Sequence, residues 1–417
     1  MIFDTYIQSA DTFLYIMLAL SAIALLGVYV LRLRRFKLVA KHASWQTEAQ
    51  AIEVATHDAL TTNADGNYPL ISIVVPVNEQ SSDIHPLLRC LFRQNYKGTF
   101  EVVIADENHS ADAFSTYEEQ KREHANLRYT FVPESSRYIE LRKLAITLGI
   151  KASRGEWVIV VNPETLPMSD EWLQRFAENL GEDVNLAEAY YNYDDDGSLV
   201  ARRAIFERID HLSARIYAWE RGVVVGCNSA NWAVRKKWFI EQNGFADSLN
   251  LAFGEEAILA NHKVEAENYI MLCSPATRLV EELPSKQTLS ILRAQGAEVR
   301  HHLSCKARKQ QSVSVFANLM CYVFALCLLL YTCIRFYMDI DAETYSECYV
   351  YADVIALLLW AVALYLPLRI VRIALHTLDE RRYGLYIYFY EMMRPLYSLS
   401  AELKRRMYRE DFTRKYI

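Results

Sequence analysis

The stretch WVIVVNPETLP, residues 157–167, decides the fold expected of this chain. Its first five residues are apolar and mostly β-branched, which is typical of a strand buried on both faces of a parallel sheet. The polar segment Asn162-Pro163-Glu164 follows directly. Ligands bind at the carboxyl ends of the strands in open α/β sheets, so this segment is a candidate part of a binding site.

Strands and helices alternate ahead of this stretch. A β-branched run predicts the first strand, and apolar residues at helical spacing predict the helix that follows it. Strands are expected over 71–75, 100–105, 127–132 and 157–161, and helices over 84–94, 111–124 and 138–152. Such a series predicts an α/β fold of Rossmann-like type, with a mostly parallel sheet and right-handed crossovers.

Two more of the expected strands end in polar residues. The first is followed by Pro76, Asn78 and Glu79, and the second by Asp106 and Glu107. Because the carboxyl ends of parallel strands meet at one edge of a sheet, these residues predict a single polar cleft. The alternative is that they are ordinary turn residues, since Asn, Asp and Pro favour turns.

Three apolar runs, 13–31, 312–334 and 354–368, resemble membrane spans in length and composition. The basic residues that flank them predict an outside N-terminus, a cytoplasmic segment over 33–311 and a cytoplasmic C-terminus. We therefore expect three transmembrane helices and a multi-pass protein of the inner (plasma) membrane. A cleaved signal peptide is the alternative for the first run, but no basic residue precedes that run.

Composition argues against several other classes of protein. The net charge of −6 over 417 residues gives no bulk attraction to nucleic acid, which is not expected as a partner. The eight cysteines include no C-x-x-C pair and no Cys/His spacing suited to zinc. A transporter or channel subunit is disfavoured, because no expected span carries a cluster of ionisable residues.

These patterns predict five parts of the chain. Aromatic and basic residues mix in the last part, which we expect to contact membrane lipids. The parts are a transmembrane anchor with its basic flank over 1–41, a linker over 42–69, a cytoplasmic α/β domain over 70–302, two transmembrane helices over 303–376 and an interfacial tail over 377–417.

Four motifs in the α/β segment resemble, in the same order, those of family 2 glycosyltransferases with a GT-A fold. They are SIVVPVNE at 72–79, LLRCLFRQNY at 87–96, EVVIADE at 101–107 and KLAITLGI at 143–150. The resemblance covers about residues 70–302. It implies an inverting transfer of a sugar from a nucleotide-sugar donor. It also implies that the nucleotide is bound by Pro76, Asn78, Glu79, Asp106, Glu107 and Lys143.

The metal-binding Asp-x-Asp motif of that family is altered in this chain. Asn162 and Glu164 stand at the two matching positions. The resemblance implies a Mg²⁺ or Mn²⁺ ion shared between these residues and the donor diphosphate. Because Asn162 offers only a neutral carbonyl oxygen, we expect this metal site to be weakened.

Further motifs imply a catalytic base and an acceptor site. The segment GCNSANWAVRK at 226–236 is similar to the family's acceptor-pocket stretch and implies a role for Asn231. The segment FGEE at 253–256 matches G-E-D, which implies Glu256 as general base with Glu255 beside it. The alternative is an acidic pair that only stabilises the start of a helix.

The segment QGAEVRHH at 295–302 lies where processive members of the family carry Q-x-x-R-W. Its tryptophan is missing and its spacing is longer, which disfavours a polymer-extruding synthase. The resemblance implies that Gln295 and Arg300 contact the acceptor or the diphosphate. The alternative is that Arg300 belongs to a basic belt beside the membrane.

Two functions from different classes are therefore expected. The first is a membrane-bound glycosyltransferase that moves a sugar to a lipid-linked or glycan acceptor. The second is a catalytically weakened GT-A domain that serves as a binding or scaffold subunit of a glycan-assembly complex. Substitution of the acidic motifs at Glu107, Asn162 and Glu256 favours the second.

Overall fold

The computed structural model describes residues 29–43, 68–78, 83–133, 141–249, 251–312, 374–380 and 386–408, with scattered positions in 16–27, 316–334 and 354–372. The chain forms two compact units. One comprises Met1–Leu38 and Lys309–Ser398, and the other Val39–Arg308 and Leu399–Ile417. The α/β fold lies in the second unit, and the five predicted parts of the chain stay a prediction.

The second unit is built around a seven-stranded sheet in the order β3-β2-β1-β4-β8-β6-β9. Each strand is short, and every residue of β1 and β4 is buried, as their apolar sequences predict. The strands are β1 Ile71–Val77, β2 Phe100–Asp106, β3 Leu127–Phe131, β4 Trp157–Val161, β6 Leu186–Ala189, β8 Asn231–Arg235 and β9 Tyr269–Leu272.

The sheet is mixed. Strands β3, β2, β1 and β4 run parallel to one another, and β9 runs parallel to β6. Strand β8 is antiparallel to both of its neighbours, β4 and β6. The predicted α/β fold is therefore confirmed, and its parallel part is the series of strands expected from the sequence.

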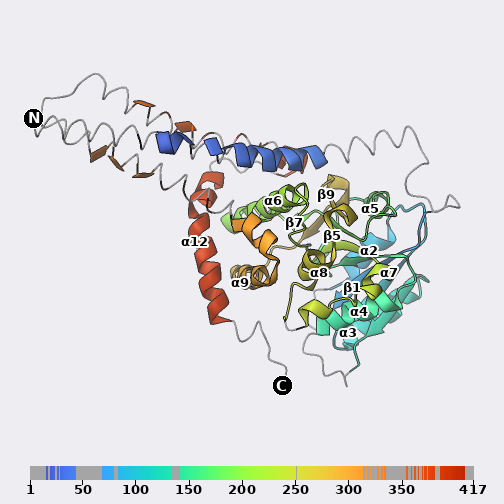
Figure 1. The fold of residues 1–417 in the computed structure, drawn as a ribbon. Helices are drawn as coiled ribbons and strands as arrows, with labels where there is room; N and C mark the ends of the chain where they lie inside the picture. The colour runs from blue at the N-terminus through green and yellow to red at the C-terminus, as the bar shows by residue number, and fades with distance from the viewer. Residues whose placement is uncertain are drawn as a thin grey trace, which may run out of the picture. The chain divides into compact units, whose positions relative to one another are not determined.

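Helices cover both faces of the parallel strands (Figure 1). On one face, helices α2 (His85–Phe92) and α5 (Trp172–Ala177) pack large apolar side chains against Ile73 and Ile159. On the other face, helix α4 (Leu141–Ala152) lies against Val74 of β1. Residues of β1 and β4 therefore point to one helical layer or the other and are buried, whereas the edge strand β3 is partly exposed.

Smaller elements complete the unit. A second sheet has the order β5-β10-β7, with β10 antiparallel to β5 and parallel to β7. Its strands are β5 Thr165–Pro167, β7 Tyr191–Tyr193 and β10 Leu279–Glu281. Its other helices are α3 Ala111–Lys121, α6 Leu199–Trp219, α7 Lys236–Glu241, α8 Glu255–Lys263 and α9 Lys286–His302, and short 3-10 turns span Ala246–Ser248, Ala266–Asn268 and Pro275–Thr277. Helix α12, Tyr386–Met407, has residues in both units, which divide after Ser398.

The prediction of three transmembrane helices is wrong. Among the residues that the structure describes, no helix is long and apolar enough to cross a membrane. The described helical stretch 29–43 overlaps the first predicted span only at its end and carries Arg32, Arg34, Arg35, Lys37 and Lys41. The multi-pass inner-membrane location rested on those spans and is corrected with them. Most residues of the second and third predicted spans, several residues of the first, and residues 44–67 of the predicted linker lie outside the described residues.

Alanine substitutions at two glycines inside helices are expected to change the stability in opposite directions. A Cβ added at Gly149 of α4 would lie 2.6 Å from Val74 Cγ1, whereas one at Gly296 of α9 meets nothing within 4 Å. We expect Gly149→Ala to lower the free energy of unfolding by about 1–3 kcal/mol through overpacking. Gly296→Ala should raise it by about 0.5–1 kcal/mol, because alanine favours the helix.

Urea unfolding of the two variants beside the wild type measures both effects. A Gly149→Ala protein as stable as Gly296→Ala would contradict the close packing of α4 on β1.

Candidate active site

The polar ends of three strands meet at one edge of the main sheet. Strand β1 lies between β2 and β4 and is parallel to both, so all three carboxyl ends point the same way. The backbone N–H of Glu107 donates to the carbonyl of Val77 at 2.9 Å, which joins the ends of β1 and β2 directly. Asn78 is partly buried next to this contact, and Asn162 follows β4 at the same edge.

Asp106 is fully buried at the end of β2 and accepts three hydrogen bonds. Its Oδ2 accepts from the Ser110 N–H at 2.8 Å and the Tyr129 hydroxyl at 2.8 Å, and its Oδ1 accepts from the Asn108 N–H at 3.0 Å. The carboxylate thus holds the turn into α3 and ties it to β3. Its predicted contact with a nucleotide stays a prediction.

The other predicted nucleotide residues differ in their exposure. Pro76 is buried within β1, and Glu107 is buried at the end of β2. Asn78 is partly exposed, and Glu79 lies outside the described residues. Among the predicted nucleotide-binding residues that the structure describes, Asn78 is therefore the best placed to meet a ligand at this edge.

An aromatic group beside Asp106 was not expected from the sequence. The His109 ring lies 4.2 Å from the Phe131 ring, and the Phe114 ring lies edge-on to Tyr129 at 5.4 Å. Phe131 is 42% exposed and Phe114 is 38% exposed. His109 has a φ of 53°, a left-handed conformation that turns the chain sharply after β2. Exposed rings at the ends of β2 and β3 suit a planar ligand.

Arg142, in the first turn of α4, joins two of the predicted site segments. Its Nη2 donates to Asn162 Oδ1 at 2.6 Å, and its Nε lies 3.5 Å from Glu255 Oε1. The arginine is about one-third exposed, whereas the Glu255 side chain is almost fully buried. The end of β4 and the start of α8 are therefore brought together by one guanidinium, which the sequence motifs did not identify.

Lys143 takes part in the same junction from the next position. Its buried ammonium group donates to the backbone carbonyls of Ser248 and Leu251, in the loop that leads to α8. Lys143 was predicted to bind a nucleotide, a role that stays a prediction. In this structure its hydrogen bonds hold the loop that precedes Glu255 and Glu256.

Glu255 and Glu256 open helix α8, and both are buried. Burial first, and then the charge of Glu255, raise the pKa of Glu256 to about 8. A hydrogen bond from its own backbone N–H, Arg142 and Lys143 act in the opposite direction. A carboxyl group with a pKa near neutrality is able to exchange a proton under physiological conditions, which is what an acid-base catalyst needs.

The residues at the β4 tip do not form a good cradle for a divalent ion. Asn162 Oδ1, one of the two predicted ligand atoms, already accepts a hydrogen bond from a cationic guanidinium at 2.6 Å. Glu164 is partly exposed and is the one carboxylate of the tip. Across the described part of the chain, no group of three or more His, Cys, Asp or Glu side chains is placed to hold a metal. The weakened Mg²⁺ or Mn²⁺ site stays a prediction.

The predicted acceptor residue Asn231 is fully buried at the start of β8. Its Nδ2 donates to the carbonyls of Tyr190 at 3.1 Å and Thr277 at 2.9 Å. The loop before it is held by Glu188, a buried carboxylate in β6 that accepts from the Asn228 N–H at 2.7 Å and pairs with Arg215 at 3.1 Å. A glutamate within the apolar run LAEA was the available sequence signal for this anchor.

Gln295 and Arg300 lie on α9, which packs against the start of α8. Gly254, the residue before α8, has a φ of 77°, and the side chain of Val299 fills the place where its Cβ would be. The end of α9 also binds α12, because Arg405 Nη1 lies 2.7 Å from Glu298 Oε2. The roles of Gln295 and Arg300 toward a ligand stay predictions, while α9 itself supports the turn that carries Glu255 and Glu256.

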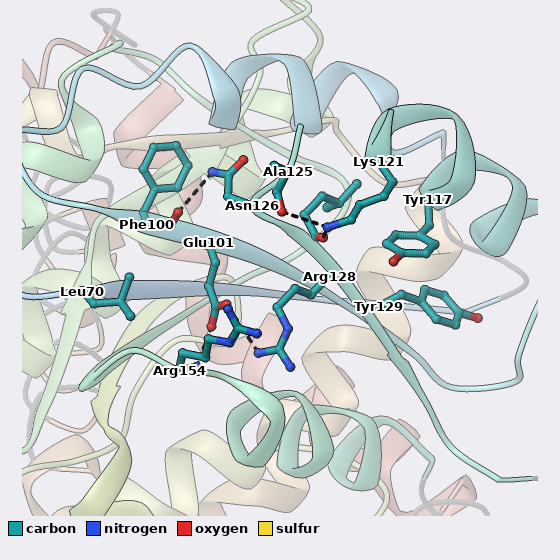
Figure 2. Close-up of a pocket in the computed structure, with 11 residues that line it drawn as sticks. Leu70, Phe100, Glu101, Tyr117, Lys121, Ala125, Asn126, Arg128, Tyr129 and Arg154 are labelled. Carbon is teal, nitrogen blue, oxygen red and sulfur yellow. Dashed lines mark hydrogen bonds and ion pairs between the residues drawn. The ribbon is translucent and has the colours of Figure 1, made fainter. Parts of the chain in front are cut away.

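A cavity of about 380 Å³ lies at the other edge of the sheet, at the amino ends of β2 and β3. Figure 2 shows Glu101, Arg128 and Arg154 gathered at one end of this cavity. Arg128 lies 3.4 Å from Glu101, and the Lys121 ammonium donates to the carbonyls of Ala125 and Leu127. These polar groups bind one another and stabilise the fold, so we place the candidate site at the carboxyl edge.

Comparison with known proteins yields one family. Residues 72–242 match the family described as glycosyl transferase family 2. No curated protein matches the chain.

Among solved structures, the chain is similar to the mannosyltransferase PcManGT from Pyrobaculum calidifontis in complex with GDP-Man and Mn²⁺. That similarity has 16% identity and a TM-score of 0.52, and it covers 93% of this chain and 99% of the other. TarS from S. aureus is similar at 14% identity and a TM-score of 0.37, with 83% and 93% covered. Glucosyl-3-phosphoglycerate synthase from Mycobacterium tuberculosis is similar at 15% and 0.37, with 57% and 78% covered.

The raised pKa of Glu256 predicts a pH-dependent contribution to stability. Its pKa rises from an ordinary value of 4.5 to about 8 on folding, so the folded state binds the proton more tightly. This contribution is complete below the unfolded value and is lost as the pH rises through about 8. We expect the free energy of unfolding to fall less steeply between about pH 5 and pH 8 in Glu256→Gln than in the wild type.

Urea unfolding at several pH values measures this slope, with Glu267→Gln on an exposed glutamate as the matched control. Equal slopes in the wild type and Glu256→Gln would show that Glu256 is ionised in the folded protein throughout this range.

Proposed function

We propose, from the premise that residues 72–242 form a glycosyl transferase family 2 domain, that this chain transfers a sugar from a nucleotide-sugar donor to a hydroxyl group of a glycan or lipid-linked acceptor. The family match confirms the resemblance and the enzyme class predicted from the motifs. The observation that best supports the reaction is the buried pair Glu255 and Glu256, linked through Arg142 to the tip of β4.

The donor nucleotide is proposed to bind at the carboxyl ends of β1, β2 and β3. Asn78 and the exposed rings of Phe131 and His109 lie there, and flat aromatic surfaces suit a nucleobase. The similar mannosyltransferase was solved with GDP-Man and Mn²⁺, and its fold extends over nearly the whole chain. That likeness supports a nucleotide sugar as the donor class.

Glu256 is proposed as the general base. Its carboxylate takes the proton of the acceptor hydroxyl as the hydroxyl oxygen forms a bond to the anomeric carbon of the donor sugar. At the same time the bond between that carbon and the donor diphosphate breaks, and its electron pair stays on the diphosphate. A single displacement of this kind inverts the anomeric configuration.

Two structural features support the step. With a pKa of about 8, Glu256 is ionised in part near neutral pH, and its carboxylate form is the one that accepts the proton. The loop and helix that carry it are fastened by Lys143 from α4 and by Val299 from α9. A base held on such rigid supports keeps the geometry on which the rate depends.

The rival function is a scaffold subunit that binds nucleotide sugars without transferring them. The observation in its favour is that Asn162, at a position where the family resemblance implies an acidic residue, is already bonded to Arg142. Calorimetry with UDP- and GDP-sugars, with and without Mn²⁺, separates the two. Binding without hydrolysis or transfer to glycan and lipid extracts would favour the scaffold.

Replacement of the proposed base tests the catalytic function. We expect Glu256→Gln to lower the rate of sugar transfer by about 10²–10⁴-fold, because the neutral amide cannot accept the proton. Binding of the nucleotide sugar should change little, since Glu256 is proposed to act on the acceptor. Transfer is measured with labelled donor and binding by calorimetry.

Glu265→Gln, on an exposed glutamate beyond the end of α8, is the control for the transfer assay. Wild-type rates in Glu256→Gln would remove Glu256 from the mechanism.

A further inference from the structure

We propose that Arg142 is the resident cation of this site, and that its guanidinium binds the donor diphosphate where the family resemblance implies a metal ion. The inference rests on the proposed function and names the group that recognises the diphosphate. It starts from one contact, the hydrogen bond of 2.6 Å from Arg142 Nη2 to Asn162 Oδ1.

The geometry leaves part of this guanidinium for a ligand. Nη2 binds Asn162, and Nε faces Glu255 at 3.5 Å. Nη1 has no hydrogen-bond partner among the residues that the structure describes. With 30% of its side chain exposed, Arg142 meets solvent at the same edge as the tip of β4. A guanidinium offers five N–H donors, so two contacts within the protein leave donors for phosphate oxygens.

The local field favours an anion at this place. Arg142 lies in the first turn of α4, a helix of 12 residues, where the helix dipole is positive. A basic residue in a first turn is unfavourable unless a negative partner compensates it. Glu255 compensates in part from one side. A diphosphate on the other side would complete the compensation, and the positive end of the helix would add to its binding.

The neutral tip of β4 fits the same interpretation. An aspartate in place of Asn162 would form an ion pair with Arg142 and cancel its charge. The asparagine instead holds the guanidinium in position through a neutral oxygen and leaves the charge in place. The family resemblance implies an acidic residue at position 162, and this chain has an asparagine there. The neutral asparagine and the position of Arg142 thus together leave a positive charge at the tip of β4.

Arg142 takes no proton in the reaction. As the bond from the anomeric carbon to the diphosphate oxygen breaks, negative charge grows on that oxygen, and the fixed guanidinium stabilises it. Paired N–H donors from one arginine match two phosphate oxygens, which a point charge does not do. Arg142 therefore acts as a catalytic residue that touches the donor and also orients it.

Nucleotide binding by purified full-length protein tests the proposal. The probes are UDP and GDP, with UMP and GMP as matched ligands that lack the second phosphate. Each is titrated in EDTA and in Mn²⁺ against the wild type, Arg142→Gln and the control Lys151→Gln, which removes a positive charge from the other end of α4.

We expect the wild type to bind one of the diphosphates in EDTA, with an affinity that Mn²⁺ changes by less than about threefold. Arg142→Gln should weaken diphosphate binding by about tenfold or more and leave monophosphate binding within about twofold. Lys151→Gln should match the wild type. The comparison of diphosphate with monophosphate distinguishes a direct phosphate contact from a general loss of structure.

A second variant keeps the test independent of folding in Arg142→Gln. Asn162→Asp retains the arginine and supplies a carboxylate that pairs with it. We expect Asn162→Asp to weaken diphosphate binding in EDTA by about tenfold and to make it depend on Mn²⁺, because a second tip carboxylate then joins Glu164.

The outcomes separate this inference from the function beneath it. Diphosphate binding by the wild type that requires Mn²⁺ and is unchanged in Arg142→Gln would overturn the role of Arg142 and keep the proposed function. Equal losses for diphosphates and monophosphates in Arg142→Gln would also overturn it, since Arg142 would then only hold β4 to α8. No binding of any of the four nucleotides to the wild type would overturn the proposed function itself.

Discussion

The parallel pairing of β1 with β2 on one side and β4 on the other is the constraint on which the rest of the molecule depends. Backbone hydrogen bonds in these buried strands leave no freedom in where the strands end. The polar residues after each strand are therefore placed at one edge by the strand pairing. The start of α8, a segment far along the chain, is joined to them through Arg142, and Lys143 holds the loop that precedes it.

Local pattern was enough for the centre of the parallel layer, because β1 and β4 are almost continuous apolar runs and α2 repeats apolar residues at the helical period. The same reasoning failed for the membrane. The apolar runs and their basic flanks predicted spans, but no described helix has the length and composition of one. Family resemblance supplied the enzyme class, since a few motifs in order carry that information even where their acidic residues are exchanged.

Contacts between segments that are distant along the chain could not be predicted from the sequence. Lys143 matches a motif, yet its ammonium is bound to the carbonyls of Ser248 and Leu251, about a hundred residues away along the chain. Asp106 and Asn231 were expected to meet ligands, and both are buried with backbone partners. Arg142 went unnoticed because an arginine in a helix has many uses, and only its neighbours in space decide among them. The aromatic rings beside Asp106 were missed for the same reason.

The close packing of Val299 against Gly254 connects the carboxyl-terminal end of the chain to the start of α8. Helix α9 rests on the turn that opens α8, and one residue before Val299 the buried Glu298 receives Arg405 from the far end of the chain. A protein shortened before residue 399 would lose the cation nearest to that carboxylate and so weaken the packing of α9 against the turn that opens α8. Arg405 of the carboxyl-terminal helix is thus connected to the start of α8 through α9, by the contacts of Glu298 and Val299.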